Sequence, residues 1–148
     1  LADFSGVKRR MEIVKTSPKA VLYDDFAHHP TAIGSTLAGL RETVGPAPIY
    51  AVLEPRSHTM RLGIHEAQLV EACKTADQVF WLKPTNLAFD LDQAVTPSGH
   101  KVFEDPLALA AAVAQQLGLE DSSAHVVIMS NGGIDALKAA LLDQIHHA

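Results

Sequence analysis

The chain alternates short runs of apolar, β-branched and aromatic residues with longer segments whose apolar residues recur every three or four positions. Short runs of this kind predict buried strands, and the longer spacing predicts amphipathic helices. Regular alternation of the two predicts a mostly parallel β-sheet with helices on both faces, a Rossmann-like three-layer α/β sandwich. The predicted strands cover residues 10–15, 20–23, 49–53, 79–82, 101–103 and 126–129.

The first two predicted strands are joined by the short polar segment Thr16-Ser17-Pro18-Lys19. A connection this short fits an antiparallel hairpin, because a parallel crossover needs a dozen or more residues. We therefore expect a mixed sheet with an antiparallel hairpin at its N-terminal edge. The predicted strand at 101–103 is short enough to be an edge strand at the other side.

Four helices are predicted from apolar stripes and from start and stop residues. One starts at Pro30 and ends at Gly45-Pro46, and another has Asp105 as its N-cap, Pro106 as its first residue and Gly118 just beyond its last turn. A third covers residues 60–76. The inward stripes of the first and of the closing helix are Ile33, Leu37, Leu40 and Val44, and Ile134, Leu137, Leu141 and Ile145.

Length and composition add limits. The chain has 148 residues, 47% of them hydrophobic, which fits one globular domain with a substantial core. A net charge of −5 with scattered basic residues argues against nucleic acid or an anionic membrane as a partner. The single Cys73 lies in a helical pattern and is expected to be a core residue in a reducing compartment. With no signal sequence and no apolar run near the roughly 20 residues that span a bilayer, we expect a cytoplasmic protein.

Polar groups gather where the predicted strands end. The segments 24–29, 54–61, 83–86 and 130–133 each follow a strand and carry charged or hydrogen-bonding side chains. Connections expected at the opposite edge, such as Gly45-Pro46-Ala47-Pro48, are chemically plain. In an open parallel sheet, ligands bind beyond the carboxyl ends of the strands. The sequence therefore predicts a ligand site built from several loops at one edge.

The segment Tyr23-Asp24-Asp25-Phe26-Ala27-His28-His29-Pro30 carries the strongest signal, because a strand runs directly into two carboxylates and two imidazoles. One acid could cap the helix that Pro30 begins, although two acids exceed what capping requires. A metal site at the two histidines is disfavoured, because they are adjacent and no HxH or HxxxH pattern follows. A bound ligand explains the crowding better.

Two further loops offer anion-binding groups. Arg56 and Arg61 are either solvated surface charges or a grip for a carboxylate or phosphate, and their polar loop favours the second reading. Ser130-Asn131-Gly132-Gly133 leads into a helix N-terminus, where backbone N–H groups favour an anion, although the glycines are also compatible with a simple tight turn.

Three motifs resemble the C-terminal domain of the Mur ligases, the ATP-dependent amide-forming enzymes of peptidoglycan assembly. They begin at Phe4 (Phe-x-Gly-Val-Lys-Arg-Arg-Met-Glu), at Asp24 (Asp-Asp-Phe-Ala-His-His-Pro-Thr) and at Glu54 (Glu-Pro-Arg-Ser-His-Thr-Met). The last motif and Ser130-Asn131-Gly132-Gly133 resemble the branch that recycles the tripeptide L-alanyl-γ-D-glutamyl-meso-diaminopimelate by joining it to UDP-N-acetylmuramate. The branch that adds L-alanine to the same sugar nucleotide is the nearest alternative.

The resemblance implies roles for particular residues. It implies an ATP site in which Arg10 lies at the nucleotide, Asp25 binds the ribose, Phe26 lies near the adenine and His29 faces the cleft between domains. Departures from the family pattern are Phe26 in place of Tyr, His58 in place of Asn, and Ile134-Asp135 in place of further glycines. The residues implied for the incoming peptide are His28, Arg56, Ser57, His58, Thr59, Arg61 and Asn131.

The resemblance also implies that this chain works only as part of a longer enzyme. A ligase of this kind needs a phosphate-binding Gly-Lys-Ser/Thr loop and Mg²⁺ ligands, and neither is found in this sequence. The family keeps these and the UDP-sugar site on two upstream domains. We therefore expect residues 1–148 to be the third domain, with residues 1–6 ending a linker, inactive alone and binding neither ATP nor Mg²⁺ tightly by itself.

The sequence is also compatible with a second class of function. A Rossmann-type module that binds a peptide or nucleotide without catalysis would show the same strand-end loops. A metal-dependent hydrolase built on His28 and His29 is the more distant alternative, and measurement of bound Zn²⁺ or Mn²⁺ tests it.

Overall fold

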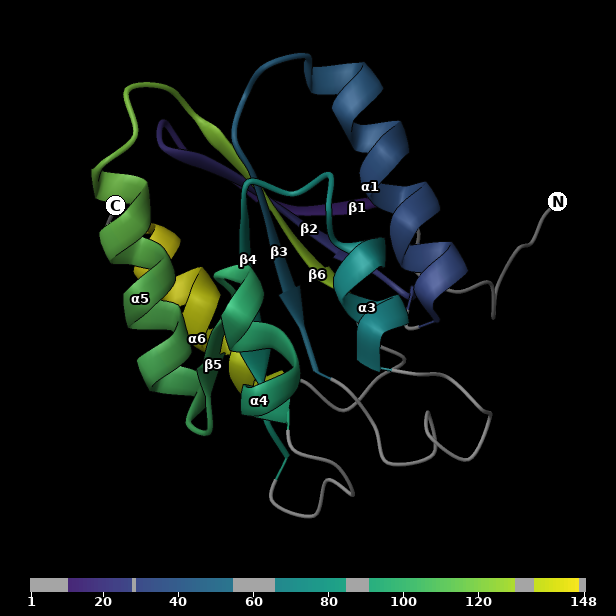
Figure 1. The fold of residues 1–148 in the computed structure, drawn as a ribbon. Helices are drawn as coiled ribbons and strands as arrows, with labels where there is room; N and C mark the ends of the chain where they lie inside the picture. Colours follow the sequence, from purple (N-terminus) through teal and green to yellow (C-terminus); the bar gives the residue numbers. More distant parts are fainter. Residues whose placement is uncertain (1–10, 28, 55–65, 85–90, 130–134, 147–148) are drawn as a thin grey trace, which may run out of the picture.

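The computed structural model describes residues 11–27, 29–54, 66–84, 91–129 and 135–146. Its centre is a six-stranded sheet with the order β1-β2-β6-β3-β4-β5 (Figure 1). The last strand of the chain, β6, lies between β2 and β3, a placement that no local pattern in the sequence indicates. The strands are β1 Glu12–Thr16, β2 Ala20–Asp25, β3 Ile49–Leu53, β4 Gln78–Leu82, β5 Lys101–Phe103 and β6 Ala124–Met129.

The sheet is mixed, as predicted. Strands β1 and β2 pair antiparallel, and every other pair is parallel. The hairpin turn is held by Ser17, whose backbone N–H donates to the carbonyl oxygen of Ala20 at 2.8 Å. The register shifts between Ile13 and Lys15, and a bulge of this kind increases the twist of an edge strand.

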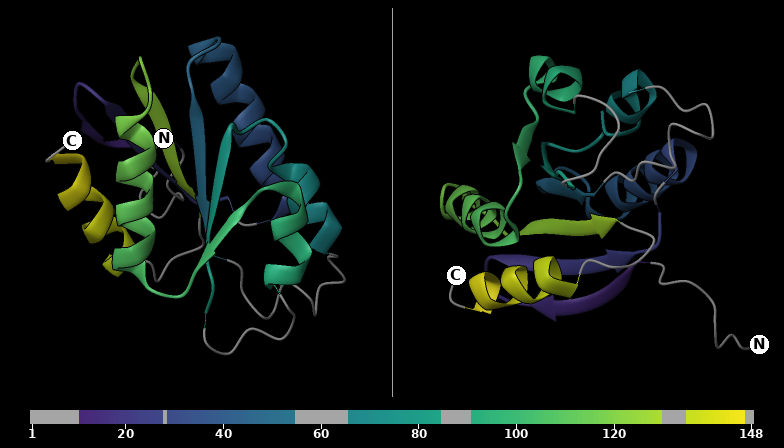
Figure 2. Two further views of the ribbon diagram at one scale, coloured as in Figure 1. Left: turned by 60° about the vertical axis from the view of Figure 1, so that its left-hand side comes forward. Right: turned by 90° about the horizontal axis from the view of Figure 1, so that it is seen from below.

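Helices cover both faces of the sheet, which confirms the three-layer α/β sandwich. Strand residues alternate between two apolar clusters, one beneath each helical layer, because successive side chains of a strand point to opposite faces. One face carries α1 Pro30–Val44, α3 Glu66–Ala72 and α4 Leu91–Val95, followed by the 3₁₀ turn η1 Thr96–Ser98, and the other carries α5 Pro106–Gly118 and α6 Asp135–His146 (Figure 2).

The predicted limits of two helices are confirmed at their N-termini. Pro30 is in the first turn of α1, and Asp105 caps α5 by accepting from the N–H groups of Leu107 and Ala108. The C-terminal limit of α5 was predicted wrongly. Gly118 belongs to the helix, and Leu119, with right-handed backbone angles, donates its N–H to carbonyl oxygens of the last turn. The helix therefore closes without a left-handed glycine.

Two other helical predictions need correction. The helix predicted over 60–76 corresponds to α3, which ends at Ala72 and not at residue 76. It ends there because the N–H groups of Cys73 and Lys74 bond to carbonyls three residues back and tighten the chain into a turn. The short elements α4 and η1 were not predicted at all. Five residues are too few for a periodic pattern to stand out.

The prediction that Cys73 is a core residue is confirmed, and Trp81 is buried as well. Trp81 and Cys73 are each 1% exposed, and burial raises the pKa of the Cys73 thiol to about 12. A buried thiol with a raised pKa is unreactive near neutral pH. Within the described residues, every helix is too short or too polar to span a bilayer.

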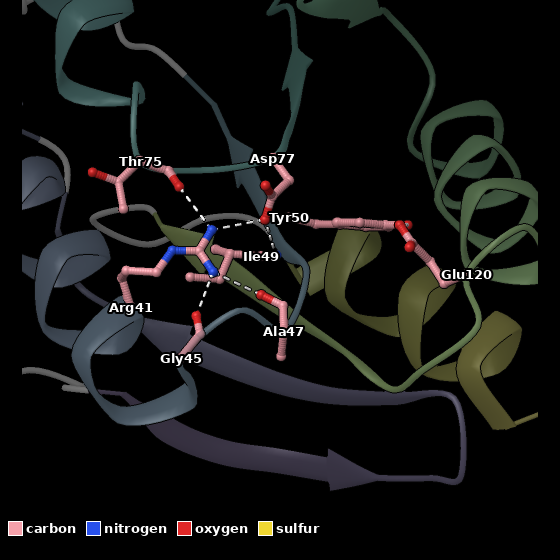
Figure 3. A network of polar contacts seen from close by, with 8 residues as sticks. All are labelled: Arg41, Gly45, Ala47, Ile49, Tyr50, Thr75, Asp77 and Glu120. Carbon is pink, nitrogen blue, oxygen red and sulfur yellow. Dashed lines mark hydrogen bonds and ion pairs between the residues drawn. The ribbon is translucent and has the colours of Figure 1, made fainter.

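The edge opposite the predicted ligand site is held by Arg41, at the last turn of α1 (Figure 3). Its guanidinium donates to the carbonyl oxygens of Gly45, Ala47 and Thr75 at 2.7, 2.8 and 3.1 Å, and to Asp77 Oδ2 at 2.8 Å. The loop 45–48 has no charged or hydrogen-bonding side chains, but its backbone carbonyls accept hydrogen bonds from Arg41. One arginine joins the end of α1 to the starts of β3 and β4.

Two histidines contribute a pH-dependent term to stability. The indole N–H of Trp81 donates to His100 Nδ1 at 3.0 Å, which requires a neutral imidazole at that position. His125 Nδ1 is 2.7 Å from the hydroxyl of Tyr23. Burial lowers the pKa of both histidines, so near pH 6 the unfolded chain binds more protons than the folded chain.

We therefore expect the free energy of unfolding to fall as the pH drops below about 6.5, the ordinary pKa of the unfolded histidine. Urea unfolding between about pH 8 and about pH 5.5 measures this slope. The double variant His100→Gln/His125→Gln should have a flatter profile over the same range. An unchanged slope in that variant would show that other groups cause the dependence.

Candidate functional site

The carboxyl ends of the central strands lie at one edge of the sheet. Asp25 of β2, Met129 of β6 and Leu53 of β3 occupy aligned positions, with Trp81 of β4 beside Leu53. The predicted alignment of the strand ends is therefore confirmed. Several predicted site residues lie outside the described residues, namely Arg10, His28, Arg56, Ser57, His58, Thr59, Arg61 and Asn131.

The two adjacent acids at the end of β2 point to opposite faces of the sheet. Asp24 is 1% exposed and pairs with Lys138 of α6, with 3.0 Å between Asp24 Oδ2 and Lys138 Nζ. Asp25 is 6% exposed and faces α1. The period of two in a strand causes this division, so the acids do not act as a pair. Neither caps α1, because its N-cap is His29, and the capping interpretation is wrong.

Asp25 accepts three hydrogen bonds from the described residues. Its Oδ1 accepts from the N–H of Ala27 at 2.8 Å and from the hydroxyl of Thr36 at 3.4 Å, while its Oδ2 accepts from the N–H of Met11 at 2.9 Å. Met11 has φ of 47°, in the left-handed region that a side chain with a Cβ rarely adopts. The Asp25 carboxylate thus holds both the turn into α1 and the residue that precedes β1.

Asp25 lines an open pocket of about 890 Å³ between the β1–β2 hairpin and α1. A volume of this size lies within the range of roughly 300 to 1,000 Å³ common for small-molecule sites. Phe26 and His29, which the family resemblance associates with ATP, line the same pocket. The other lining residues are mostly apolar or small: Met11, Ile13, Tyr23, Ala27, Ala32, Ser35, Thr36, Gly39, Leu40 and Thr43.

His29 is oriented by the start of α1. Its Nδ1 accepts from the backbone N–H of Thr31 at 3.4 Å, so in the neutral ring the proton is on Nε2. The residue is exposed and lines the pocket. The imidazole therefore presents a hydrogen-bond donor at the mouth of a pocket whose deeper charged group, Asp25, is an acceptor.

Several lining residues were missed from the sequence. Ala32, Ser35, Thr36, Gly39 and Thr43 fall at helical spacing on the side of α1 that faces the hairpin. Their small size leaves room between α1 and the hairpin. The signal was present as small residues every three to four positions beside the apolar stripe, but only the pairing of β1 with β2 shows what faces them.

Tyr23 closes the pocket on the sheet side. Its ring stacks on His125 with 5.7 Å between ring centroids, and burial raises the pKa of the Tyr23 hydroxyl. The phenol is therefore neutral near pH 7 and is already hydrogen-bonded to His125. Tyr23 shapes the wall of the pocket and supplies no charge to it.

Among the described residues, no three side chains of His, Cys, Asp or Glu come together to form a candidate metal site. The described part of the pocket instead combines one carboxylate, one imidazole, hydroxyls and apolar walls, which suits an organic ligand with hydroxyl groups.

A mostly parallel sheet covered by helices, with a pocket that extends from the end of β2 along α1, defines a Rossmann-like α/β domain. Residues 9–132 match the family described as "Mur ligase, glutamate ligase domain". The chain therefore belongs to the Mur ligase family and corresponds to its C-terminal domain.

Relatives with known names fit this assignment. The chain is 40% identical over 148 residues to UDP-N-acetylmuramate–L-alanyl-γ-D-glutamyl-meso-2,6-diaminoheptandioate ligase of Escherichia coli K12, covering 97% of this chain and 31% of that protein. It also resembles a crystal structure of a murein peptide ligase from Psychrobacter arcticus 273-4, with a TM-score of 0.78, 31% identity, and 95% and 30% coverage. The chain thus spans about a third of the length of these relatives.

A relative of the alternative branch matches over a shorter stretch. UDP-N-acetylmuramate–L-alanine ligase of Mycobacterium ulcerans is 38% identical over 85 residues, which cover 55% of this chain and 17% of that protein. The two branches are thus similar in percentage identity but differ in how much of the chain they match.

Proposed function

We propose that this chain is the third domain of an ATP-dependent ligase that joins L-alanyl-γ-D-glutamyl-meso-diaminopimelate to UDP-N-acetylmuramate in peptidoglycan recycling. The observation that carries the proposal is the pocket that contains Asp25, Phe26 and His29 in a chain of this family. Residues 1–6 would end the linker from the central ATP-binding domain, which follows a UDP-sugar-binding domain. Nucleotide substrates of this kind fit a cytoplasmic location.

The nucleotide side of the proposal rests on Asp25. Its carboxylate is fixed by two backbone N–H groups, and a fixed acceptor is suited to a ribose hydroxyl. Arg10 directly precedes Met11 in the sequence, and the N–H of Met11 donates to Asp25. We propose that Arg10 contacts the nucleotide as well. Phe26 would contact the adenine, and His29 would donate from Nε2 at the pocket mouth.

When bound, ATP with Mg²⁺ supplies the activation of the sugar-nucleotide carboxylate that the amine of the peptide then attacks. The residues of this chain would bind and orient, and the proposal assigns no bond-making group to them. Their contribution is proximity and closure over the nucleotide and the incoming amine.

The peptide side of the proposal follows from strand order. In the sheet, β6 lies next to β2 and β3 lies next to β6, so Met129 and Leu53 end at the same edge as Asp25. The segments 130–134 and 55–65 follow these two strand ends in the sequence. We propose that His28, Arg56, Ser57, His58, Thr59, Arg61 and Asn131 bind the tripeptide from these loops. Arginines suit its carboxylates, which they grip with two parallel hydrogen bonds.

The tripeptide is favoured over L-alanine as the substrate by the extent of similarity. The E. coli tripeptide ligase matches 97% of the chain, whereas the alanine ligase of M. ulcerans matches 55%. An ATP-dependent ligation assay on the full-length protein, with UDP-N-acetylmuramate and either amine, decides between the two. Turnover with L-alanine alone would assign the protein to the other branch, and no turnover with either would favour a non-catalytic binding module.

In the same assay, Arg56→Ala should raise the KM for the tripeptide about tenfold or more, because a bidentate contact to a carboxylate is lost. The KM for ATP should change far less. Lys74→Ala is the control, because Lys74 is an exposed residue paired with Glu71. Equal effects of Arg56→Ala on both substrates would contradict the assignment of this loop to the peptide.

A further inference from the structure

We propose that Thr36 is a positioning residue that holds the Asp25 carboxylate so that a single acceptor site, on Oδ2, is offered to one ribose hydroxyl. The inference rests on the proposed nucleotide site. It adds Thr36 to that site and states how many ribose hydroxyls donate to Asp25. Thr36 lies in the second turn of α1, is half-buried and lines the pocket.

The hydroxyl of Thr36 donates to a different kind of acceptor from those of two other threonines in this chain. A threonine inside a helix commonly donates its hydroxyl to the carbonyl four residues back. Thr43 does so to Gly39 at 3.1 Å, and Thr96 does so to Asp92 at 2.6 Å. The hydroxyl of Thr36 instead crosses from α1 to Asp25 Oδ1 at the end of β2, at 3.4 Å.

The number of acceptor sites on Asp25 then limits what it can bind. An ionised carboxylate has about four lone-pair sites. On Oδ1, the N–H of Ala27 and the hydroxyl of Thr36 occupy both sites, and on Oδ2 the N–H of Met11 occupies one. Counting the contacts of the described residues, one site on Oδ2 is left at the carboxylate that lines the pocket. Asp25 can therefore accept from one hydroxyl of a ribose and not from both.

The side chain of Thr36 is suited to this task. A β-branched residue in a helix has few χ1 rotamers, so its hydroxyl is held in place by the helix itself. The terminal torsion of an aspartate is broad, and additional hydrogen bonds narrow it. Thr36 thus adds a contact from α1 to the two backbone contacts, and the carboxylate is fixed from three separate segments.

The test measures binding of ATP, 2′-deoxy-ATP and 3′-deoxy-ATP to the full-length protein by titration calorimetry. In the unaltered protein, one deoxynucleotide should bind about tenfold more weakly than ATP, and the other should bind nearly as well as ATP. Thr36→Val should weaken ATP binding about fivefold and reduce the discrimination between the two deoxynucleotides, because Oδ1 gains an open site.

Two variants keep this test specific. Thr36→Ser retains the hydroxyl and should restore both affinity and discrimination. Thr96→Val removes a threonine hydroxyl outside the pocket and should alter neither. A general loss of helix stability would not change the ratio of the affinities for 2′-deoxy-ATP and 3′-deoxy-ATP. That ratio therefore distinguishes a role of Thr36 in positioning Asp25 from a purely structural role.

Each outcome has a consequence. Thr36→Val with unchanged affinity and ratio, or equal losses with both deoxynucleotides in the unaltered protein, would overturn the inference. Asp25→Asn is measured alongside: if it leaves ATP binding unchanged, the proposed nucleotide site itself is wrong. If Asp25→Asn weakens binding and Thr36→Val does not, only the role of Thr36 fails.

Discussion

Asp25→Asn in the full-length protein is expected to raise the KM for ATP about 100-fold, because hydrogen bonds to a charged group are among the strongest single contacts. The expected cause is loss of the acceptor for the ribose. The amide also places an N–H₂ group against the N–H of Met11 or of Ala27, each of which now donates to the carboxylate at less than 3 Å. Steady-state kinetics with ATP as the varied substrate measures the effect.

The neighbouring acid is a matched control for this substitution. Asp24→Asn makes the same chemical change one residue earlier, on the other face of the sheet, where Asp24 pairs with Lys138. Asp24→Asn should lower the free energy of unfolding, because the charge of Lys138 loses its partner beside a buried side chain. It should change the KM for ATP much less than Asp25→Asn. If the two variants raised the KM for ATP equally, Asp25 would have no special role at the nucleotide.

Arg41→Ala is expected to lower the free energy of unfolding by about 2 to 4 kcal/mol, since a multiply bonded charged group is removed and its acceptors lose their partner. The guanidinium joins Gly45, Ala47, Thr75 and Asp77, and Asp77 Oδ2 in turn accepts from the N–H of Ile49 at 2.8 Å. Urea unfolding of the unaltered protein and the variant measures the difference.

Arg41→Lys tests the geometric part of this expectation. A lysine keeps the charge but cannot reach four acceptors with a planar fork, so it should recover only part of the loss. The KM for ATP in Arg41→Lys should stay near that of the unaltered protein, because Arg41 lies at the opposite edge of the sheet from Asp25. A loss below about 0.5 kcal/mol for Arg41→Ala would class it with ordinary surface substitutions.

Predictions from the sequence were most successful where a local pattern was long or marked by caps. The apolar stripe and Pro30 predicted α1, and Asp105 with Pro106 predicted the start of α5. They failed at the short α4 and at the end of α3, where a turn begins at Cys73. The helix α4 is too short for a periodic pattern to stand out, and α3 ends in local hydrogen bonds to carbonyls three residues back, which an apolar stripe does not reveal.

For the site, the sequence predicted which segments carry polar groups but not how Asp25 is held. The pocket includes Asp25, Phe26 and His29, whose binding of ATP stays a prediction, while Thr36 and the small residues of α1 were not predicted to line it. The roles of the loop residues, among them Arg56 and Asn131, stay predictions. Similarly, Arg41 was not recognised as a central structural residue, because its acceptors are mostly backbone carbonyls.

The sequence by itself determined the α/β class, the mixed sheet and the family, because these depend on hydrophobic period, turn residues and contiguous motifs. Only the tertiary structure decided that β6 lies between β2 and β3, that Asp24 and Asp25 serve opposite faces, and that Thr36 reaches Asp25. The physical reason is distance along the chain. The residues that meet when strands pair, or when a helix packs on a strand end, are far apart in the sequence. Local patterns do not relate their positions, which are set only when the whole domain packs.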